Sequence, residues 1–420
     1  MKLPLEGVRV CDLTVAVAGP QCTSLLAEMG AEVIKIENIN ARLGGGTVTL
    51  PRKPGVEVDH PYNRSPVFHE WNRGGKKGIT LNLLRPEAME AFFRLVRVSD
   101  LVVENFSPRV MPNLGLHYEA LKAVKPDIIM ISMPALGSTG PYSARSSLGP
   151  GIDAMSGMAH LGGFPDGPPT KPGRVMGDFN AAMIGAYAAM MALYVRSRTG
   201  KGQRIELAMR EGQTFLIGEY IIDATMNGRS PMRTGNRHSS MAPHNVYPCQ
   251  GEDEWVSIAV GSDDEWQRLR AALGDPEWTR DHLFEDAVGR YRHQEEIDRH
   301  LADWTRLHTA YEVMTSLQAA GVTSGAVLNG RDVTADPHFR ARGYIRTVDT
   351  PEAGPVYMAR PGFILTRTPS TPQAAPGFAE HNDYVFGELL GYSPQEILQM
   401  EEVQAISRVP INLEAGEPSS

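Results

Sequence analysis

The first 132 residues repeat one pattern, in which a short run of apolar, often β-branched residues is followed by a segment of helix length. Such runs indicate buried strands, and the segments between them are long enough to hold helices that connect parallel strands. The runs are residues 8–13, 32–37, 79–83, 101–105 and 128–132. A chain with this alternation is predicted to be an α/β protein built on a parallel sheet.

The first 37 residues form the clearest strand–helix–strand unit. Strand 8–13 leads into the loop 14–19, and a helix can begin at Pro20, where the missing N–H group costs little. The helix is expected to end near Gly30, before strand 32–37. Ligands of open parallel sheets bind at the carboxyl ends of strands, so the loop 14–19 is a predicted ligand-binding loop. It contains no GxGxxG, so the dinucleotide fingerprint is absent.

The character of the sequence changes near residue 236. A polar loop is followed by a strand at 255–260 and by helices at 263–273, 292–307 and 310–320, which together predict a smaller α+β domain. The expected boundaries are 1–210 for the N-terminal part of a large domain, 211–235 for a linker, 236–345 for the smaller domain, 346–376 for a Pro-rich linker and 377–420 for a helical C-terminal part.

The composition is that of an ordinary globular enzyme. Of the 420 residues, 42% are hydrophobic and 21% are charged; the net charge is -8 and the pI is near 5.9. This balance gives no reason to expect nucleic acid or a membrane as a partner. The three cysteines form no CxxC, and the first residues lack the apolar region of a signal peptide. A cytoplasmic location is therefore expected.

One carboxylate stands at the head of a long apolar run. Asp178 precedes residues 181–195, which are rich in Ala, Gly and Met and predict a helix packed closely on several sides. In its first turn, the helix dipole would favour the ionised carboxylate by about 0.3–1 kcal/mol, or under about one pKa unit. Asp178 is thus a candidate nucleophile, with a helix N-cap as the alternative. A membrane span is disfavoured, because the run falls short of about 20 strongly apolar residues.

Two stretches place polar side chains beside predicted strands. Residues 72–78 combine Lys76, Lys77 and a third cation with glycines. This combination can hold phosphates, although a plain basic turn has the same composition. Asn105 follows a strand and is either a ligand contact or a strand-end turn residue.

Motifs of metalloproteases and serine hydrolases are absent. The sequence contains neither HExxH nor GxSxG, and no metal is expected. His238 and His244 lie in the polar loop 235–244 and are candidates for a substrate-contacting loop, with ordinary loop histidines as the alternative.

Short segments spread along nearly the whole chain carry a family resemblance. In order they are LEGVRVCDL (5–13), AGP (18–20), GAEVIKIE (30–37), NRGGKKGITLNL (72–83), VENF (103–106), GSTGPY (137–142), GD (177–178) and TGKGQ (199–203). Each segment is weak alone, but their order is highly specific. The chain resembles the class III CoA-transferases, the group of formyl-CoA transferase and carnitine CoA-transferase.

The resemblance implies a fold and a mechanism. It implies a Rossmann-like large domain made from both chain ends, a smaller domain between them, and two protomers interlocked like links. Asp178 matches the family's catalytic aspartate, which forms aspartyl anhydride and aspartyl-CoA thioester intermediates. Backbone N–H groups of the loop 15–19 are the expected stabilisers of the oxyanions. Coenzyme A thioester is then a substrate, and no cofactor is expected.

The resemblance also implies contacts to CoA. The residues matched to its path are Val17, Asn38, Leu81, Leu83, Asn105, Phe106 and Met209, and the inferred phosphate contacts are Lys76, Lys77 and Arg109. Several positions depart from the family. Asn38 and Asn113 stand where well-known members have arginines, Pro150 where one has lysine, and Val17 where formyl-CoA transferase has glutamine. Phosphate binding is therefore expected to shift to Arg42, Arg73 or Arg109.

The departures also bear on the substrate. The glycine-rich loop of formyl-CoA transferase is missing, with residues 235–244 expected in its place, so oxalate and formyl-CoA are not expected. A larger acid, aromatic or dicarboxylic, is expected instead.

Two other functions remain as alternatives. A 2-methylacyl-CoA racemase would need a histidine where this chain has Ile152, because two-base proton exchange requires it. A catalytically silent CoA-binding subunit of a hetero-oligomer is disfavoured by the presence of Asp178. The expected assembly is a homodimer, with a heterodimer containing a paralogue as the alternative.

Overall fold

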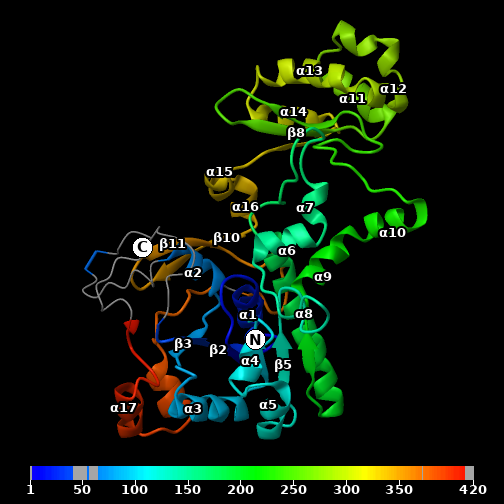
Figure 1. The fold of residues 1–420 in the computed structure, drawn as a ribbon. Coiled ribbons are helices and arrows are strands. Elements are labelled where there is room, and N and C mark those ends of the chain that lie inside the picture. Colours follow the sequence, from blue (N-terminus) through cyan, green and yellow to red (C-terminus); the bar gives the residue numbers. More distant parts are fainter. Residues whose placement is uncertain (1, 41–53, 56–64, 371, 412–420) are drawn as a thin grey trace. The chain divides into compact units, whose positions relative to one another are not determined.

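The computed structural model describes residues 2–40, 54–55, 65–370 and 372–411 (Figure 1). Contacts divide the chain into two compact units, each described by itself. Unit 1 comprises Met1–Ala159, Lys171–Arg229 and His338–Ser420, and unit 2 comprises His160–Thr170 and Ser230–Pro337. Unit 1 thus draws on both ends of the chain, and unit 2 overlaps the expected range 236–345.

Unit 1 is built on a six-stranded parallel sheet with the strand order β3-β2-β1-β4-β5-β6. The strands are β1 (Arg9–Asp12), β2 (Glu32–Glu37), β3 (Lys77–Thr80), β4 (Leu101–Glu104), β5 (Ile129–Ser132) and β6 (Arg204–Glu206). This is the order of doubly wound folds, in which the direction of winding reverses between β1 and β4. The predicted α/β class and parallel sheet are confirmed.

Helices cover both faces of this sheet, because side chains alternate along each strand. Cys11 and Val102 point to one face and pack with α3 (Pro86–Arg97), α5 (Tyr118–Val124) and the C-terminal helices Asp383–Leu389 and α17 (Pro394–Glu402). Val10 and Val103 point to the other face and pack with α1 (Ala18–Glu28) and α8 (Met176–Thr199). Residues far apart in sequence therefore complete one core.

Helix α8 is the longest helix among the described residues and ends at Gly200, whose φ of 68° lies in the left-handed region. Its alanines allow close packing against α1. By length and composition alone α8 could cross a membrane, whereas the sequence suggested that it falls short. Core helices also pass that test, and α8 packs against α1, α6 (Gly149–Met155), α9 (Met209–Thr214) and β5.

The other elements of unit 1 are short. They are α2 (Pro66–Trp71), α4 (Val110–Asn113), α10 (Gly218–Asn227) and an antiparallel pair, β10 (Ile345–Thr350) and β11 (Gly354–Ala359). Two further short helices, α7 (Met158–Leu161) and α16 (Pro337–Ala341), lie where the chain passes from one unit to the other.

Unit 2 contains a three-stranded antiparallel sheet covered by helices. Its strands are β7 (His244–Pro248), β8 (Trp255–Ala259) and β9 (Thr323–Ala326). The helices are α11 (Asp263–Ala272), α12 (Ala287–Arg292), α13 (Gln294–Thr305), α14 (Ala310–Ala319) and α15 (Gly330–Ala335). The helix expected at 292–307 is present as α13, which begins after His293, and α12 precedes it as a separate short helix.

Candidate active site

Asp178 lies in the first turn of α8 and is not its N-cap. The helix begins at Met176, and the preceding Val175 is the N-cap residue, whose side chain makes no capping hydrogen bond. Asp178 is therefore not the N-cap residue of this helix, which was the alternative to a catalytic role. Because Asp178 itself belongs to the helix, the helical backbone fixes the direction in which its side chain leaves the chain.

The surroundings of Asp178 bury one of its carboxyl oxygens without a hydrogen-bond partner. The backbone N–H groups of Ala18, the first residue of α1, and of Asp178 itself lie near the carboxyl group and lower its pKa. Its Oδ2 atom has no hydrogen-bond partner among the described residues, although the side chain is only 8% exposed. A buried carboxylate that lacks a hydrogen-bond partner for one oxygen is less stabilised than a solvated one, which makes it more reactive toward an electrophile.

Gly149 leaves the space that this oxygen occupies. A Cβ atom at position 149 would overlap Asp178 Oδ2 and the side chain of Val175. We expect Gly149→Ala to displace the carboxyl group and to slow covalent labelling of Asp178 by an acyl-CoA at least about tenfold, as misplacement of a reacting group does. The matched control is Gly218→Ala, where a Cβ meets open space. Equal labelling rates in the two variants would contradict the described packing.

A second carboxyl group, that of Asp153, lies beside the start of α8. It is fully buried in α6, and its Oδ1 atom accepts hydrogen bonds from the Gly177 N–H group at 3.1 Å and from Gln213 Nε2 at 3.4 Å. Its Oδ2 atom and Gln213 Oε1 have no partner among the described residues. The first turn of α8 is thus anchored to a buried carboxyl group of another helix.

These surroundings raise the pKa of Asp178 from 3.8 to about 6. Burial is the main cause and the nearby Asp153 is the second, while the N–H groups of Ala18 and Asp178 lower the pKa less strongly. The expectation that the helix start keeps this pKa low is therefore wrong, because desolvation and a like charge outweigh the dipole.

The loop 14–19 is tied down by a buried ionic cluster at the end of β1. Asp12 accepts hydrogen bonds from Thr14 N at 2.9 Å and from Thr23 Oγ1 at 2.5 Å, and it pairs with Lys76 at 3.1 Å and Lys35 at 3.7 Å. Burial alone would raise the pKa of Asp12, but the two lysines and two hydroxyl groups bring it to about 2. The cluster fixes the loop that carries Ala18.

Lys76 is consequently not available to a ligand. Its side chain is fully buried, and Nζ donates to Asp12, Thr23 and the carbonyl oxygen of Pro20. Burial lowers the pKa of Lys76 to about 8. The inferred phosphate contact of Lys76 is therefore corrected to a structural role, since an ammonium group with these partners cannot also reach a surface phosphate.

The remaining candidate cations lie in different surroundings. Arg109 is exposed and Lys77, the first residue of β3, is half-buried, so both stay candidates for phosphate contacts. Arg73 is buried and pairs with Glu28 at 2.9 Å, so it is no longer a candidate for a phosphate contact. Arg42 lies outside the described residues.

Asn105 and Val17 support the loop beside Asp178. Asn105 Oδ1 accepts from Val15 N and its Nδ2 donates to Val15 O, both at 2.8 Å, so this side chain holds the loop rather than standing free. Val17 is the N-cap residue of α1 and is buried. These contacts join the chain segments that follow β1 and β4.

The other residues matched to the CoA path are mostly apolar and packed. Leu81 and Met209 are buried, and Leu83 and Phe106 are partly buried against the core of α3 and α5. Asn38 is exposed and lines a cavity of about 390 Å³ at the carboxyl ends of β1 and β2. This cavity also contains Glu37, whose pKa burial raises to about 7.

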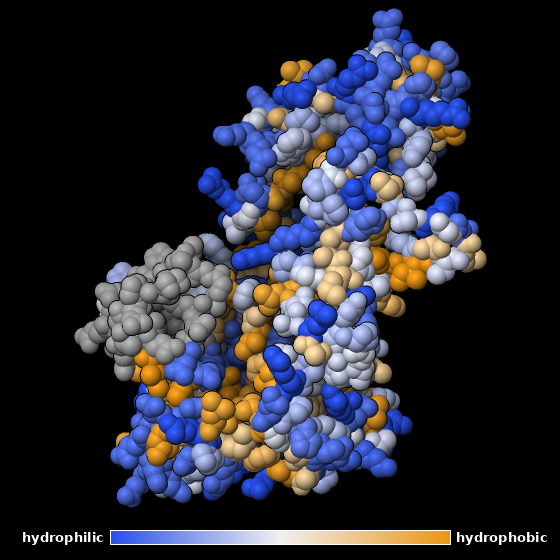
Figure 2. Space-filling view, in the orientation of Figure 1, coloured by the Kyte–Doolittle hydropathy of each residue, from blue (hydrophilic) through white to orange (hydrophobic). Residues whose placement is uncertain are grey.

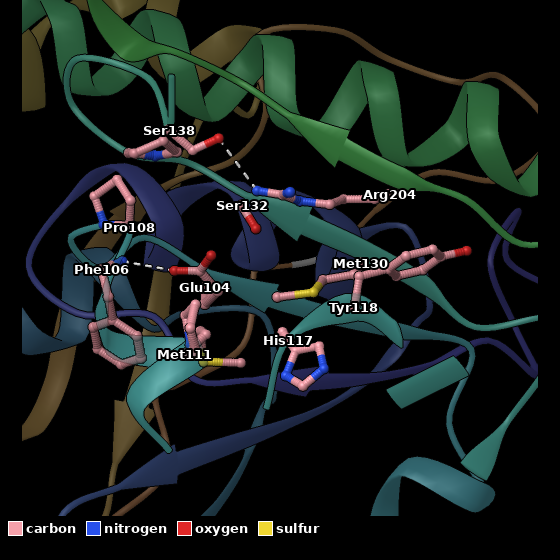
Figure 3. A pocket seen from close by; sticks show the side chains of 12 residues that line it. Glu104, Phe106, Pro108, Met111, His117, Tyr118, Met130, Ser132, Ser138 and Arg204 are labelled. Atoms are coloured by element: carbon pink, nitrogen blue, oxygen red, sulfur yellow. Dashed lines mark hydrogen bonds between the residues drawn. The ribbon is translucent and has the colours of Figure 1, made fainter. Parts of the chain in front are cut away.

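Phe106 also lines a smaller cavity of about 70 Å³ on the sheet face opposite α8 (Figure 3). Glu104 accepts a hydrogen bond from Phe106 N at 2.8 Å there, and Ser138 accepts one from Arg204 at 3.4 Å (Figure 3). The cavity is separate from Asp178, which lies on the α8 side.

His238 and His244 lie together in unit 2. Their ring centroids are 5.4 Å apart, His244 Nδ1 contacts Asn236 O at 2.5 Å, and His238 Nδ1 accepts from Ser240 N at 3.2 Å. The structure therefore brings the two histidines of the predicted loop together, and their role in substrate contact stays a prediction.

Asp153, Gln213 and Glu37 are the polar residues near the site that sequence patterns did not single out. Asp153 follows Ile152 in a segment without a recognisable local motif, and a lone Gln in a short helix carries no signal. Among the described residues, no group of three or more His, Cys, Asp or Glu side chains is arranged to hold a metal ion.

Comparison with known proteins agrees with this geometry. Residues 5–382 match the profile of CoA-transferase family III. The chain is 35% identical over 404 residues to the succinyl-CoA–D-citramalate CoA-transferase of Chloroflexus aurantiacus, covering 96% of this chain and 98% of that protein. The chain belongs to CoA-transferase family III.

Two further family members support the assignment. The succinate–glutarate CoA-transferase of Agrobacterium fabrum is 31% identical over 389 residues, covering 92% of this chain and 96% of that protein. The crystal structure of a CAIB/BAIF family protein from Brucella suis superposes with a TM-score of 0.84 at 30% identity, covering 93% of this chain and 100% of that one. As a family III CoA-transferase, the protein is an enzyme of CoA transfer.

Proposed function

We propose that the protein moves CoA from an acyl-CoA thioester to a free carboxylic acid, with Asp178 as the covalent carrier. The observation that supports this most strongly is the carboxyl group of Asp178, which lies near the Ala18 N–H group in the first turn of α8 with its buried Oδ2 atom unpartnered among the described residues. The family membership supplies the reaction class, and this carboxylate supplies the nucleophile.

The first half of the reaction loads CoA onto the enzyme. An Asp178 carboxylate oxygen attacks the thioester carbonyl carbon, the C–S bond breaks, and a mixed anhydride and CoA thiolate form. The thiolate then attacks the aspartyl carbonyl carbon, which gives an aspartyl-CoA thioester and releases the donor acid. That acid leaves with one oxygen atom that came from Asp178.

The second half reverses these steps with the acceptor. The acceptor carboxylate attacks the aspartyl thioester, giving a second anhydride and thiolate, and the thiolate attacks the acceptor's carbonyl carbon. The new acyl-CoA leaves and Asp178 is restored with one oxygen from the acceptor. Backbone N–H groups of the 15–19 loop stabilise the oxyanions, and no metal or prosthetic group takes part.

The ionisation of Asp178 gives this scheme a pH dependence. Since only the carboxylate attacks and its pKa is about 6, the rate of covalent labelling by an acyl-CoA should fall as the pH is lowered through about 6. Single-turnover labelling between pH 5 and 8, with folding checked by circular dichroism, measures this. A rate that stays constant down to pH 5 would contradict the raised pKa.

The substrates are proposed to be dicarboxylic acids and their CoA thioesters. Two of the relatives are named for succinyl-CoA or succinate with citramalate or glutarate, which are all dicarboxylic compounds. A panel of acyl-CoAs and free acids, followed by mass spectrometry of the new thioesters, tests the proposal. Transfer only among monocarboxylic acids would contradict it, and loss of α-deuterium without acyl exchange would indicate a racemase instead.

The assembly is proposed to be an interlocked homodimer in the cytoplasm. Exposed apolar side chains follow one face of α8, at Met183, Tyr187 and Tyr194, and others, including Ile222 and Met226, lie on α10. Figure 2 shows apolar residues exposed on α10. Large apolar surfaces of this kind mark interfaces. Light scattering of the purified protein should give about twice the 45.9 kDa chain mass, and a monomeric mass would contradict the dimer.

A further inference from the structure

Asp153 is a buried carboxyl group beside the start of α8 whose burial the covalent scheme does not explain. Asp153 is 0% exposed, its Oδ1 atom binds Gly177 N and Gln213 Nε2, and its Oδ2 atom has no partner among the described residues. Burying a carboxyl group with a single satisfied oxygen is costly. Gly177 directly precedes Asp178, so this group is attached to the turn that carries the nucleophile.

No other ionisable group has this position. In the described part of the chain, α8 packs mainly against α1, α6, α9 and β5. In α1, Glu28 pairs with Arg73, and burial raises the pKa of the Cys22 thiol to about 12, so that it stays neutral. Arg210 and Glu211 lie in α9, and β5 carries no ionisable residue. Within α8, the charged residues besides the nucleophile are in the last turn. Asp153 is the one charged residue that contributes to the raised pKa of Asp178.

We propose that Asp153 is a positioning residue that anchors the first turn of α8 through Gly177 and whose negative charge makes the Asp178 carboxylate a stronger nucleophile. This inference rests on the proposed function. Asp153, a residue of α6, would thus affect the reaction without contacting the substrate.

The physical reason lies in the charge of Asp178 in each state. The free carboxylate is negative, whereas the aspartyl anhydride and the aspartyl thioester carry no charge on that side chain. A fixed negative charge at Asp153 therefore repels the free carboxylate but not its acylated forms, which favours acylation. The repulsion also makes the carboxylate more basic, and a more basic oxygen attacks more readily.

The test compares pH profiles of the wild type and two variants. Asp153→Asn keeps an oxygen for the Gly177 N–H group and removes the charge, and Asp153→Ser removes the charge with a shorter side chain. Asp127→Asn, at the opposite edge of the sheet before β5, is the control. The readout is the single-turnover rate of hydroxylamine-sensitive labelling of Asp178 by succinyl-CoA from pH 4 to 8, with folding checked by thermal unfolding.

We expect the acid limb to move down by about one pH unit in both charge-removing variants, since a neighbouring like charge shifts a carboxyl pKa by that order. At pH 8 their labelling should also be slower than in the control. An acid limb that stays at the wild-type position in folded variants would overturn the inference and leave Asp153 a structural residue. If the wild type forms no adduct at all, the result would instead contradict the proposed function on which the inference rests.

Discussion

Replacing Asp178 with alanine is expected to abolish CoA exchange and the covalent adduct together. The side chain supplies the attacking oxygen and carries both the anhydride and the thioester, so nothing else in the described site can substitute for it. Removal of a covalent nucleophile lowers kcat by about 10⁴-fold or more. Acyl exchange between succinyl-CoA and a panel of acids, together with peptide mass spectrometry after hydroxylamine treatment, measures both effects.

Two further variants test whether the loss of activity is specific to the Asp178 carboxylate. Asp178→Asn keeps the size and most hydrogen bonds of the side chain but lacks the nucleophilic carboxylate, so it should be as inactive as the alanine variant. Asp127→Asn replaces a half-buried aspartate that pairs with Lys125 at 2.9 Å and with Arg196, in the last turn of α8, at 3.7 Å, and it should retain full activity. Full exchange by either Asp178 variant would refute the assignment.

The second large effect concerns the folding of unit 1. Lys76→Met should lower its free energy of unfolding by about 3–5 kcal/mol, because removing one partner of a buried ion pair leaves the other charge uncompensated. Asp12 would keep Lys35 at 3.7 Å but lose Lys76 at 3.1 Å in a fully buried position. Denaturant unfolding followed by circular dichroism measures the loss.

The adjacent residue provides the control. Lys77 is half-buried with no ion pair described for its side chain, and Lys77→Met should change the free energy of unfolding by only about 0.5 kcal/mol or less. If the two substitutions cost the same, the ionic cluster beneath the 14–19 loop does not stabilise unit 1 in the way described.

The sheet of unit 1 could be predicted from local pattern. The apolar runs at β1, β2, β4 and β5 are buried on both faces, as parallel strands between two helix layers require, so composition alone reveals them. The boundaries were less predictable. β3 begins at Lys77, two residues before the apolar run, because pairing with β2 extends its backbone hydrogen bonds.

The candidate site was only partly predictable, because its electrostatics depend on residues distant in sequence. The position of Asp178 in the first turn of α8 follows from the apolar run after it. Its raised pKa depends on Asp153, 25 residues earlier, and on burial by α1 and α6, which no local pattern reports. Lys76 was predicted to contact a phosphate because its glycine neighbours suggest an exposed turn. In the structure its side chain is instead buried in an ion pair with Asp12.

The most direct test of Asp178 as the carrier follows an oxygen atom. If the acceptor acid is labelled with heavy oxygen in its carboxylate, the second half of the reaction should leave one labelled oxygen on Asp178 after each turnover. Mass spectrometry of the peptide containing Asp178 should then show the mass increase of one heavy oxygen after a single turnover, rising towards that of two after many turnovers, and only when both acyl-CoA and acceptor are present. An unlabelled peptide after many turnovers of transfer would show that CoA does not pass through this carboxylate.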